Sequence, residues 1–395
     1  MGVKSVESSK TFFILLFLSC LNINEWGSLI FIFLCVYTII KLGLEVPVDP
    51  NNYLLCTLLS VICALVSLFY FGTNATVKCI NYCGAYIIGY SIISKAYNKV
   101  KLIKNCLFSI FAGYSCQIIF VFIYNIYKGQ PSTRTLYAVW NDGLISVTLI
   151  ALLSSVVIGY SFYAFFCSKN IVLIIYSFIT LIITAMINIL TATRTPFLLF
   201  AIVYLFLILA FFKNVHLSVK IKFAFVLLGI AIIAIICYQH DWFGIKTFWL
   251  NSALFERFGE EGVQTGRIEI AKQFISYMLQ YPFGGGFARQ EIHNYAHNIL
   301  LEIYDMYGVI PFFITLVIYI EAIRNIILVV KKGKDVSCNH LLAGLYIAII
   351  IQMFLEPVIE GFPILFYTFL FIHGICNSYI RFSREDKLVN EDIRD

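Results

Sequence analysis

Residues 265–311 read TGRIEIAKQFISYMLQYPFGGGFARQEIHNYAHNILLEIYDMYGVIP, a long polar stretch late in a chain that is otherwise strongly apolar. The stretch combines arginines, histidines, three consecutive glycines and helix signals. Binding and catalytic residues concentrate in loops that a rigid scaffold holds in place. In a chain that is mostly apolar, such a polar stretch is therefore expected to have a role in binding or catalysis. The stretch also divides the apolar segments into two groups.

The composition predicts a polytopic membrane protein. Hydrophobic residues make up 61% of the 395 residues and charged residues 13%, whereas soluble domains average about 25% charged residues. The net charge of +6 does not indicate nucleic-acid binding, because membrane proteins place such an excess in cytoplasmic loops.

The apolar runs predict an all-α fold with about 12 transmembrane helices, since a span needs roughly 17–25 residues. We expect spans near residues 11–23, 28–44, 53–71, 79–94, 106–127, 143–166, 171–190, 196–212, 223–238, 299–330, 341–355 and 362–380. The 299–330 run is long enough to begin with a helix partly outside the bilayer. The expected organisation is helices 1–9 in 1–238, a large outward-facing loop with the active-site motifs in 239–298, helices 10–12 in 299–380, and a charged cytoplasmic tail in 381–395.

The distribution of lysine and arginine predicts the orientation. With this alternation, 19 basic residues fall on the side of the two termini and nine on the other side. Positive residues favour the cytoplasm. Both termini are therefore expected to be cytoplasmic, with the 239–298 loop outside. The 12 cysteines lie almost all within or beside apolar runs, which favours packing roles over a disulfide framework.

Residues 265–281 have the pattern of an amphipathic helix that lies on the membrane surface or caps the bundle. Apolar residues recur at spacings of three and four, Thr265 is a candidate N-cap, and Pro282 a stop. A packing helix explains that pattern. It does not explain Arg267 in the first turn, where the helix dipole disfavours a cation. A guanidinium beside a helix N-terminus favours a phosphate group.

The residues after this helix supply further candidates. Gly284, Gly285 and Gly286 permit tight turns and close backbone approach to a ligand, or serve only as a hinge. His293 and His297 have the spacing of one helical turn. An HxxxH pair can bind zinc, but the glutamate of HExxH is missing, so no metal site is expected. The two histidines share the loop with Arg257, Arg267 and Arg289, which favours a functional site over isolated structural histidines.

A further arginine lies in the turn TATRTP, residues 191–196, between two apolar spans. Arg194 is expected at the outer interface. Snorkelling is one explanation. The other is a ligand, because a basic residue on an outward turn opposes the charge bias.

These motifs together resemble the O-antigen ligase/polymerase superfamily. The shared features are TGR before an amphipathic helix, then PFGGGF, then HN-x-L-L ahead of a glycine, and the arginine turn TATRTPFLLF, in which Thr193 replaces the usual serine. The resemblance covers about residues 191–311. It implies a GT-C-like membrane glycosyltransferase, such as a Wzy-type polymerase of O-antigen or capsule, that transfers a glycan from undecaprenyl diphosphate to a sugar hydroxyl of another lipid-linked unit.

The resemblance also implies roles for particular residues. Arg194 and Arg267 would stabilise the diphosphate leaving group, and His297, the position that matches the HN motif, would act on the acceptor hydroxyl. Substrate-binding candidates are Arg289, His293, Asn298 and Gly285. No cofactor and no nucleic acid is expected. The implied partners are the lipid-linked oligosaccharides and the bilayer of the bacterial inner membrane, with a chain-length regulator and a flippase as further candidates.

Three other interpretations remain open at this stage. An O-antigen ligase would transfer the glycan to a lipid A core, and the sequence separates it poorly from a polymerase. A flippase or transporter usually places ionisable residues near the midplane, whereas Glu321, Glu356 and Glu360 here fall near span ends. In a structural or sensory protein the loop arginines would be incidental.

Overall fold

The computed structural model describes most of the chain. The described residues are 9–42, 50–129, 135–141, 143–212, 236, 238–241, 245–250, 252, 254–255, 266–333 and 335–392. Most of the predicted span at 223–238, together with Arg257 and Thr265, lies outside these residues.

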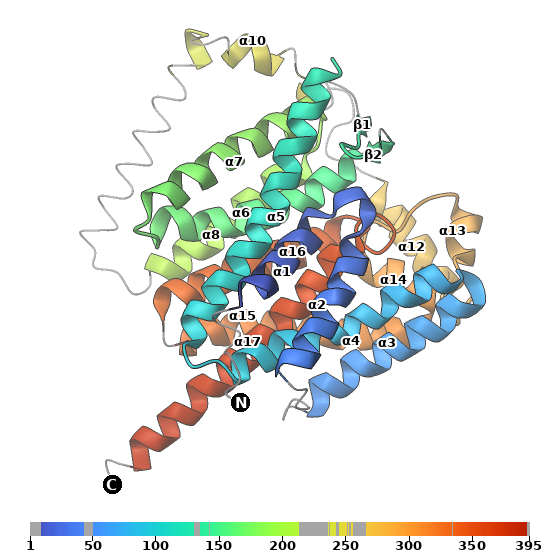
Figure 1. Cartoon of the computed structure of the whole chain (residues 1–395). Coiled ribbons are helices and arrows are strands. Elements are labelled where there is room, and N and C mark those ends of the chain that lie inside the picture. The colour runs from blue at the N-terminus through green and yellow to red at the C-terminus, as the bar shows by residue number, and fades with distance from the viewer. Residues whose placement is uncertain are drawn as a thin grey trace.

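The N-terminal part consists of eight long helices in succession (Figure 1), with bounds α1 Lys10–Leu21, α2 Gly27–Leu42, α3 Pro50–Tyr70, α4 Thr73–Ser94, α5 Lys99–Tyr127, α6 Val147–Phe166, α7 Ile171–Leu190 and α8 Thr195–Phe212. A short 3₁₀ helix, η2 Ile23–Glu25, joins α1 to α2. Local signals set several starts: the side chains of Asn98 and Asn170 cap α5 and α7, because their oxygens accept otherwise unpaired N–H groups.

The C-terminal part contains short helices followed by long ones, with bounds α10 Ile245–Leu250, α12 Arg267–Tyr277, α13 Phe287–Ile292, α14 Ile299–Tyr307, α15 Val309–Lys332, α16 Val336–Leu355 and α17 Pro363–Asp392. The 299–330 run is indeed two helices, because Gly308 separates α14 from α15. Pro363 is the first residue of α17, a position where proline costs no hydrogen bond.

Seven of the described helices are long and apolar enough to cross a membrane: α3, α5, α6, α7, α15, α16 and α17. α1, α2 and α8 are apolar but shorter. The nearly all-helical, polytopic membrane fold predicted from composition is therefore confirmed.

A small β-hairpin was not predicted. β1 Thr135–Tyr137 pairs antiparallel with β2 Leu144–Ser146, with Leu136 opposite Ile145. The expected span at 143–166 consequently begins at Val147. The apolar residues of the hairpin had extended the predicted span at its N-terminal end. The buried side chain of Asn125, at the end of α5, bonds both the N–H and the C=O of Tyr137 and holds the hairpin on that helix.

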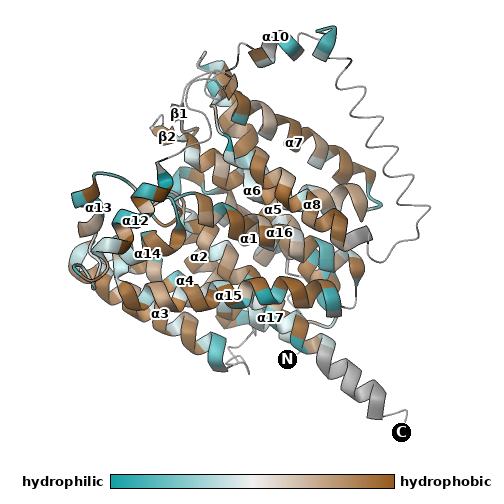
Figure 2. Cartoon of the chain, turned by 180° about the vertical axis from the view of Figure 1, so that it is seen from behind, coloured by the Kyte–Doolittle hydropathy of each residue, from teal (hydrophilic) through white to brown (hydrophobic). Residues whose placement is uncertain are grey.

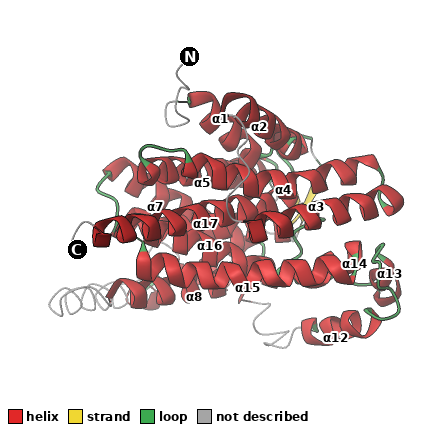
Figure 3. Cartoon of the chain, turned by 90° about the horizontal axis from the view of Figure 1, so that it is seen from below, coloured by secondary structure: helices red, strands yellow, loops and turns green. Residues whose placement is uncertain are grey.

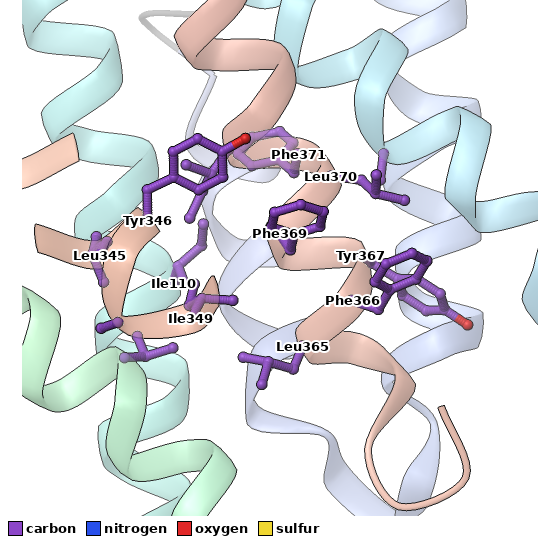
Figure 4. Close-up of a cluster of buried hydrophobic side chains, with 14 of the residues drawn as sticks. Ile110, Leu345, Tyr346, Ile349, Leu365, Phe366, Tyr367, Phe369, Leu370 and Phe371 are labelled. Carbon is purple, nitrogen blue, oxygen red and sulfur yellow. The ribbon is translucent and has the colours of Figure 1, made fainter. Parts of the chain in front are cut away.

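The core is centred on α17, which packs most extensively on α4 and also contacts α15 and α16. Figure 4 shows its aromatic side chains, among them Phe366 and Phe369, between neighbouring helices. The α4 and α17 backbones approach closely: a Cβ on Gly89 would lie 2.1 Å from the Phe371 carbonyl oxygen, and one on Gly374 would lie 2.3 Å from that of Tyr86. Small residues allow such backbone approach between membrane helices.

The helices α12, α13 and α14 gather at one end of the bundle, away from the end of α17 (Figures 1 and 3). Figure 2 shows that brown, hydrophobic segments dominate the long helices, while hydrophilic colour is common around α12 and α13. The polar stretch that interrupts the sequence is thus also a polar cap on the fold.

Candidate functional site

The helix α12 packs on α13 and α14, and its first residue, Arg267, contacts the end of α16. Phe274 is fully buried against residues of α13 and α14, including Ala288 and Tyr304. This packing shows that the helix caps the neighbouring short helices α13 and α14. The helix begins at Arg267 with Gly266 as the cap residue and ends at Tyr277, before the expected stop at Pro282, because residues 278–280 form turns.

The side chain of Arg267 meets the residue that follows α16. Its Nη2 donates to Oε1 of Glu356 at 3.0 Å, and its Nη1 donates to the Leu355 carbonyl at 2.9 Å. The hydroxyl of Thr195 donates to the same Oε1 at 2.8 Å. Nδ1 of His297 lies 3.6 Å from the other oxygen, Oε2. Three separate parts of the chain therefore converge on Glu356, and we call Thr195, Arg267, His297 and Glu356 the Glu356 centre.

The Glu356 centre is layered by exposure. The Glu356 side chain is 6% exposed, while those of Arg267 and His297 are 35% and 29% exposed. Burial acts to raise the pKa of Glu356, but His297, the Arg267 charge and the Thr195 hydroxyl together hold it below its ordinary value. The carboxylate is therefore kept ionised beneath a guanidinium and an imidazole that both reach the surface.

Arg194 lies next to this centre in sequence. It precedes Thr195, the first residue of α8, and its carbonyl accepts the N–H groups of Phe197 and Leu198 at the start of that helix. Thr191 and Thr193 bond each other at 2.9 Å within the buried turn. The contact from Thr195 to Glu356 thus brings the arginine turn and the 266–298 segment to the same place.

The two histidines do not share a helical face. α13 ends at Ile292, His293 adopts a left-handed conformation with φ of 56°, and α14 begins only at Ile299. His297 joins the Glu356 centre, whereas His293 is exposed. The spacing suggested a helical pair, and that prediction was wrong because left-handed backbone at His293 ends the short helix. No group of three or more metal-binding side chains occurs in the described part of the chain.

Asn298 is the N-cap of α14. Its Oδ1 accepts the N–H of Leu300 at 2.8 Å, and its Nδ2 donates to the Phe354 carbonyl at 3.3 Å. Both polar atoms of its side chain are therefore used to tie α14 to the end of α16. This arrangement places His297 beside Glu356 and gives Asn298 a positioning role.

The glycine run is a backbone-packing element. Gly284, Gly285 and Gly286 all have positive φ values, and the N–H groups of Gly285 and Gly286 donate to the carbonyls of Met306 and Asp305. A Cβ on Gly284 would lie 2.5 Å from the Gly308 nitrogen. Positive φ therefore explains all three glycines, and close approach of two backbone segments adds to this at Gly284.

A second set of charges lies beside the first. Nη1 of Arg289 bonds Oε1 of Glu360, and the Arg289 guanidinium lies 5.4 Å from the centre of the Tyr295 ring. Glu302, buried in α14, accepts the N–H groups of Val358 and Glu360 at 2.6 and 2.8 Å. Burial raises the pKa of Glu302 to about 7 despite these hydrogen bonds. Glu302 thus holds the 356–360 segment that carries both acids.

The acid at the heart of the site was missed from the sequence. Glu356 appeared there only as one of three glutamates near span ends, and it lies 89 residues from Arg267. The sequence did contain one signal for Glu356: it is an ionisable residue at the end of an apolar span, on the side where the loop is also expected, and Pro357 follows it.

The fold and the site define a membrane-embedded helical protein with a charged centre at one end of its bundle. Residues 178–316 match the family model described as O-antigen ligase. This match covers about a third of the chain and supports the O-antigen ligase/polymerase superfamily, whose members are glycosyltransferase-like enzymes. No curated protein matches the chain. The matched region contains Thr195, Arg267 and His297 but ends before Glu356.

Proposed function

We propose that the protein is a polysaccharide polymerase that transfers a glycan from undecaprenyl diphosphate to a sugar hydroxyl of another lipid-linked repeat unit. The reaction would take place on the outer face of the cytoplasmic membrane, in O-antigen or capsule synthesis. The observation that supports this most is the Glu356 centre, which combines an oriented imidazole and a guanidinium at the surface of the polar cap.

His297 is suited to act on the acceptor hydroxyl. Glu356 faces its Nδ1, which leaves Nε2 for the substrate. A carboxylate beside one ring nitrogen favours the ring orientation in which the other nitrogen faces the substrate. As the acceptor oxygen attacks the anomeric carbon, the bond from that carbon to the diphosphate oxygen breaks, and the hydroxyl proton passes to His297. A single displacement of this kind would invert the anomeric centre.

Arg267 and Arg194 are suited to the leaving group. A lipid diphosphate gains negative charge as the glycosidic bond breaks, and fixed cations stabilise that charge. The Arg267 guanidinium bonds a carbonyl and a carboxylate through two of its nitrogens, so its orientation is set before substrate binds. Arg289, which bonds Glu360 beside this centre, is assigned an auxiliary role.

Surface-glycan gels from cells that carry single variants test this assignment. Arg194→Ala, Arg267→Ala, His297→Ala and Glu356→Gln should each remove the long-chain ladder while the protein persists in the membrane. We expect losses in transfer rate of roughly 10²–10⁴-fold for His297→Ala, the usual contribution of general acid–base groups. Lys272→Ala, at an exposed position on α12, is the matched control and should leave the ladder intact. Normal ladders in all four site variants would refute the assignment.

The match to the O-antigen ligase description favours a second candidate, transfer to a lipid A core. Deletion of the gene separates the two activities. Loss of long chains with single units still on the surface supports the polymerase. Long polymer that accumulates on the lipid carrier, with nothing transferred, supports the ligase.

A further inference from the structure

A cavity lies beside the charged cap, outside the Glu356 centre. Its volume is about 200 Å³, and four connections line it: the α1–α2 turn, the start of α4, the end of α5 with the hairpin, and the α16–α17 connection. Glu360 contributes to its wall and also bonds Arg289. The cavity is thus continuous with the charged end of the bundle, although its walls come mainly from the N-terminal half.

The lining has the chemistry of a sugar site. Amide and carboxyl side chains that can donate to or accept from hydroxyl groups alternate with aromatic rings; they include Asn22, Asn24, Glu25, Gln117, Trp140 and Asn141. The charged residues of the lining are one cation, Lys78, and two carboxylates, those of Glu25 and Glu360. This balance disfavours a diphosphate and favours an uncharged polyhydroxylated ligand.

One polar group in the wall is unsatisfied. Gln117 is 6% exposed, and its Oε1 has no hydrogen-bond partner among the described residues. A buried amide oxygen without a hydrogen-bond partner destabilises the folded state. Gln117 also lines the cavity. The oxygen itself is covered, so a ligand hydroxyl would donate to it after rotation of the amide.

Trp140 supplies an aromatic ring to the wall of the cavity. The ring is 41% exposed and contacts Phe120 edge-on, with ring centres 6.0 Å apart. The bonds from Asn125 to Tyr137 hold the hairpin against α5. The position of the indole is therefore set by the fold before any ligand arrives.

The cavity is close to the proposed chemistry. Glu356 and Glu360 are four residues apart, so at most about 14 Å of chain separates them. The cavity is smaller than the roughly 300–1,000 Å³ of sites for drug-sized ligands. One sugar ring fits such a volume, whereas a whole repeat unit does not.

We propose that this cavity binds one pyranose ring of a lipid-linked oligosaccharide while another part of the substrates occupies the Glu356 centre. The proposal rests on the proposed glycosyl transfer. The ring belongs either to the acceptor or to the transferred donor glycan, which present the same chemistry.

Transfer kinetics with purified full-length protein distinguish the two sources. The first probe is a lipid-free repeat-unit oligosaccharide, which can only accept because it has no diphosphate to lose. The second is the lipid-linked unit as donor. Trp140→Ala should raise the KM for one of these two substrates roughly tenfold, the loss that follows from one aromatic contact. Gln117→Leu should raise the same KM roughly fivefold, the loss that follows from one hydrogen bond. In both variants kcat should change little. Trp26→Ala, an exposed tryptophan of the α1–α2 turn outside the lining, is the control.

Each outcome has a definite meaning. A higher KM for the lipid-free oligosaccharide places the acceptor in the cavity, and a higher KM for the lipid-linked donor alone places the donor glycan there. Unchanged KM values for both substrates in both variants overturn the inference and leave the polymerase assignment standing. Full transfer activity in His297→Ala would refute the proposed function. In that case, binding of the oligosaccharide to the wild type but not to Gln117→Leu would still support sugar binding in the cavity.

Discussion

At the residue scale, the buried carboxylate of Glu356 organises the cations of the site. The cations themselves could be recognised from the sequence. Arg267 stood out because a cation in the first turn of a helix opposes the dipole, and Arg194 because it opposes the charge bias. Glu356 had no such local anomaly. Its bonds to Thr195 and Arg267 join segments that only the packing of α8, α12 and α16 brings together.

Glu302 makes a prediction at this scale. Its pKa is about 7 in the fold against an ordinary 4.5. Because the pKa in the folded state is the higher one, the protonated Glu302 side chain makes its full contribution to the stability of the fold below about pH 4.5. This contribution is lost as the pH rises through about 7. The difference corresponds to about 3 kcal/mol. Thermal unfolding of the solubilised protein should therefore show a falling melting temperature from pH 5 to pH 8.

The Glu302→Gln variant should flatten this dependence, because the side chain no longer ionises. Glu269→Gln, at an exposed position on α12, should keep the wild-type slope. An equally steep slope in Glu302→Gln would show that another group is responsible.

At the element scale, the polar stretch is three short helices docked by backbone contacts rather than a flexible loop. The 282–286 turn packs on the α14–α15 junction, where the Val309 N–H donates to the Pro282 carbonyl. The apolar stripe of α12 is divided as a result: Phe274 is buried, while Ile268 and Ile275 are exposed. Periodicity predicted the helix correctly but could not assign which apolar side chains face the bundle.

Gly308 tests this docking. It has φ of 95°, and a Cβ there would lie 2.5 Å from the Pro282 carbonyl oxygen. Gly308→Ala should destabilise the cap by roughly 1–3 kcal/mol, seen as a lower melting temperature and faster proteolysis within residues 278–298. For comparison, Gly266→Ala adds a Cβ with nothing within 4 Å and should change the melting temperature little. A melting temperature of Gly308→Ala equal to the wild type would show that the junction tolerates a side chain.

At the scale of the whole molecule, the connections predicted to face outward meet in space. The α1–α2, α5–α6 and α16–α17 connections line one cavity, and the 266–298 segment reaches it through Arg289 and Glu360. A different cavity gathers the predicted cytoplasmic ends, with Asn51, Tyr90, Arg324 and Arg381 in its wall. For these connections, the two predicted sides separate into two different cavities.

Reporter fusions test the orientation. A fluorescent protein fused to the C-terminus should fluoresce, because it folds in the cytoplasm. Alkaline phosphatase fused after Gly361 should be active and after Lys332 inactive, because the first position is expected outside and the second inside. The reverse pattern at both phosphatase positions would contradict the positive-inside assignment.

The sequence by itself determined the membrane class, the helical fold, the break before α15 and the cationic candidates, because hydropathy, capping residues and misplaced charges are local properties. The tertiary structure decided the rest. It brought Glu356 to Arg267 and His297, separated His293 from His297, and used the glycine run for backbone packing. It also placed Trp140 and Gln117 around one cavity. These relations depend on which faces of distant helices meet, and hydrophobic periodicity records that a face is apolar but not which partner it packs against.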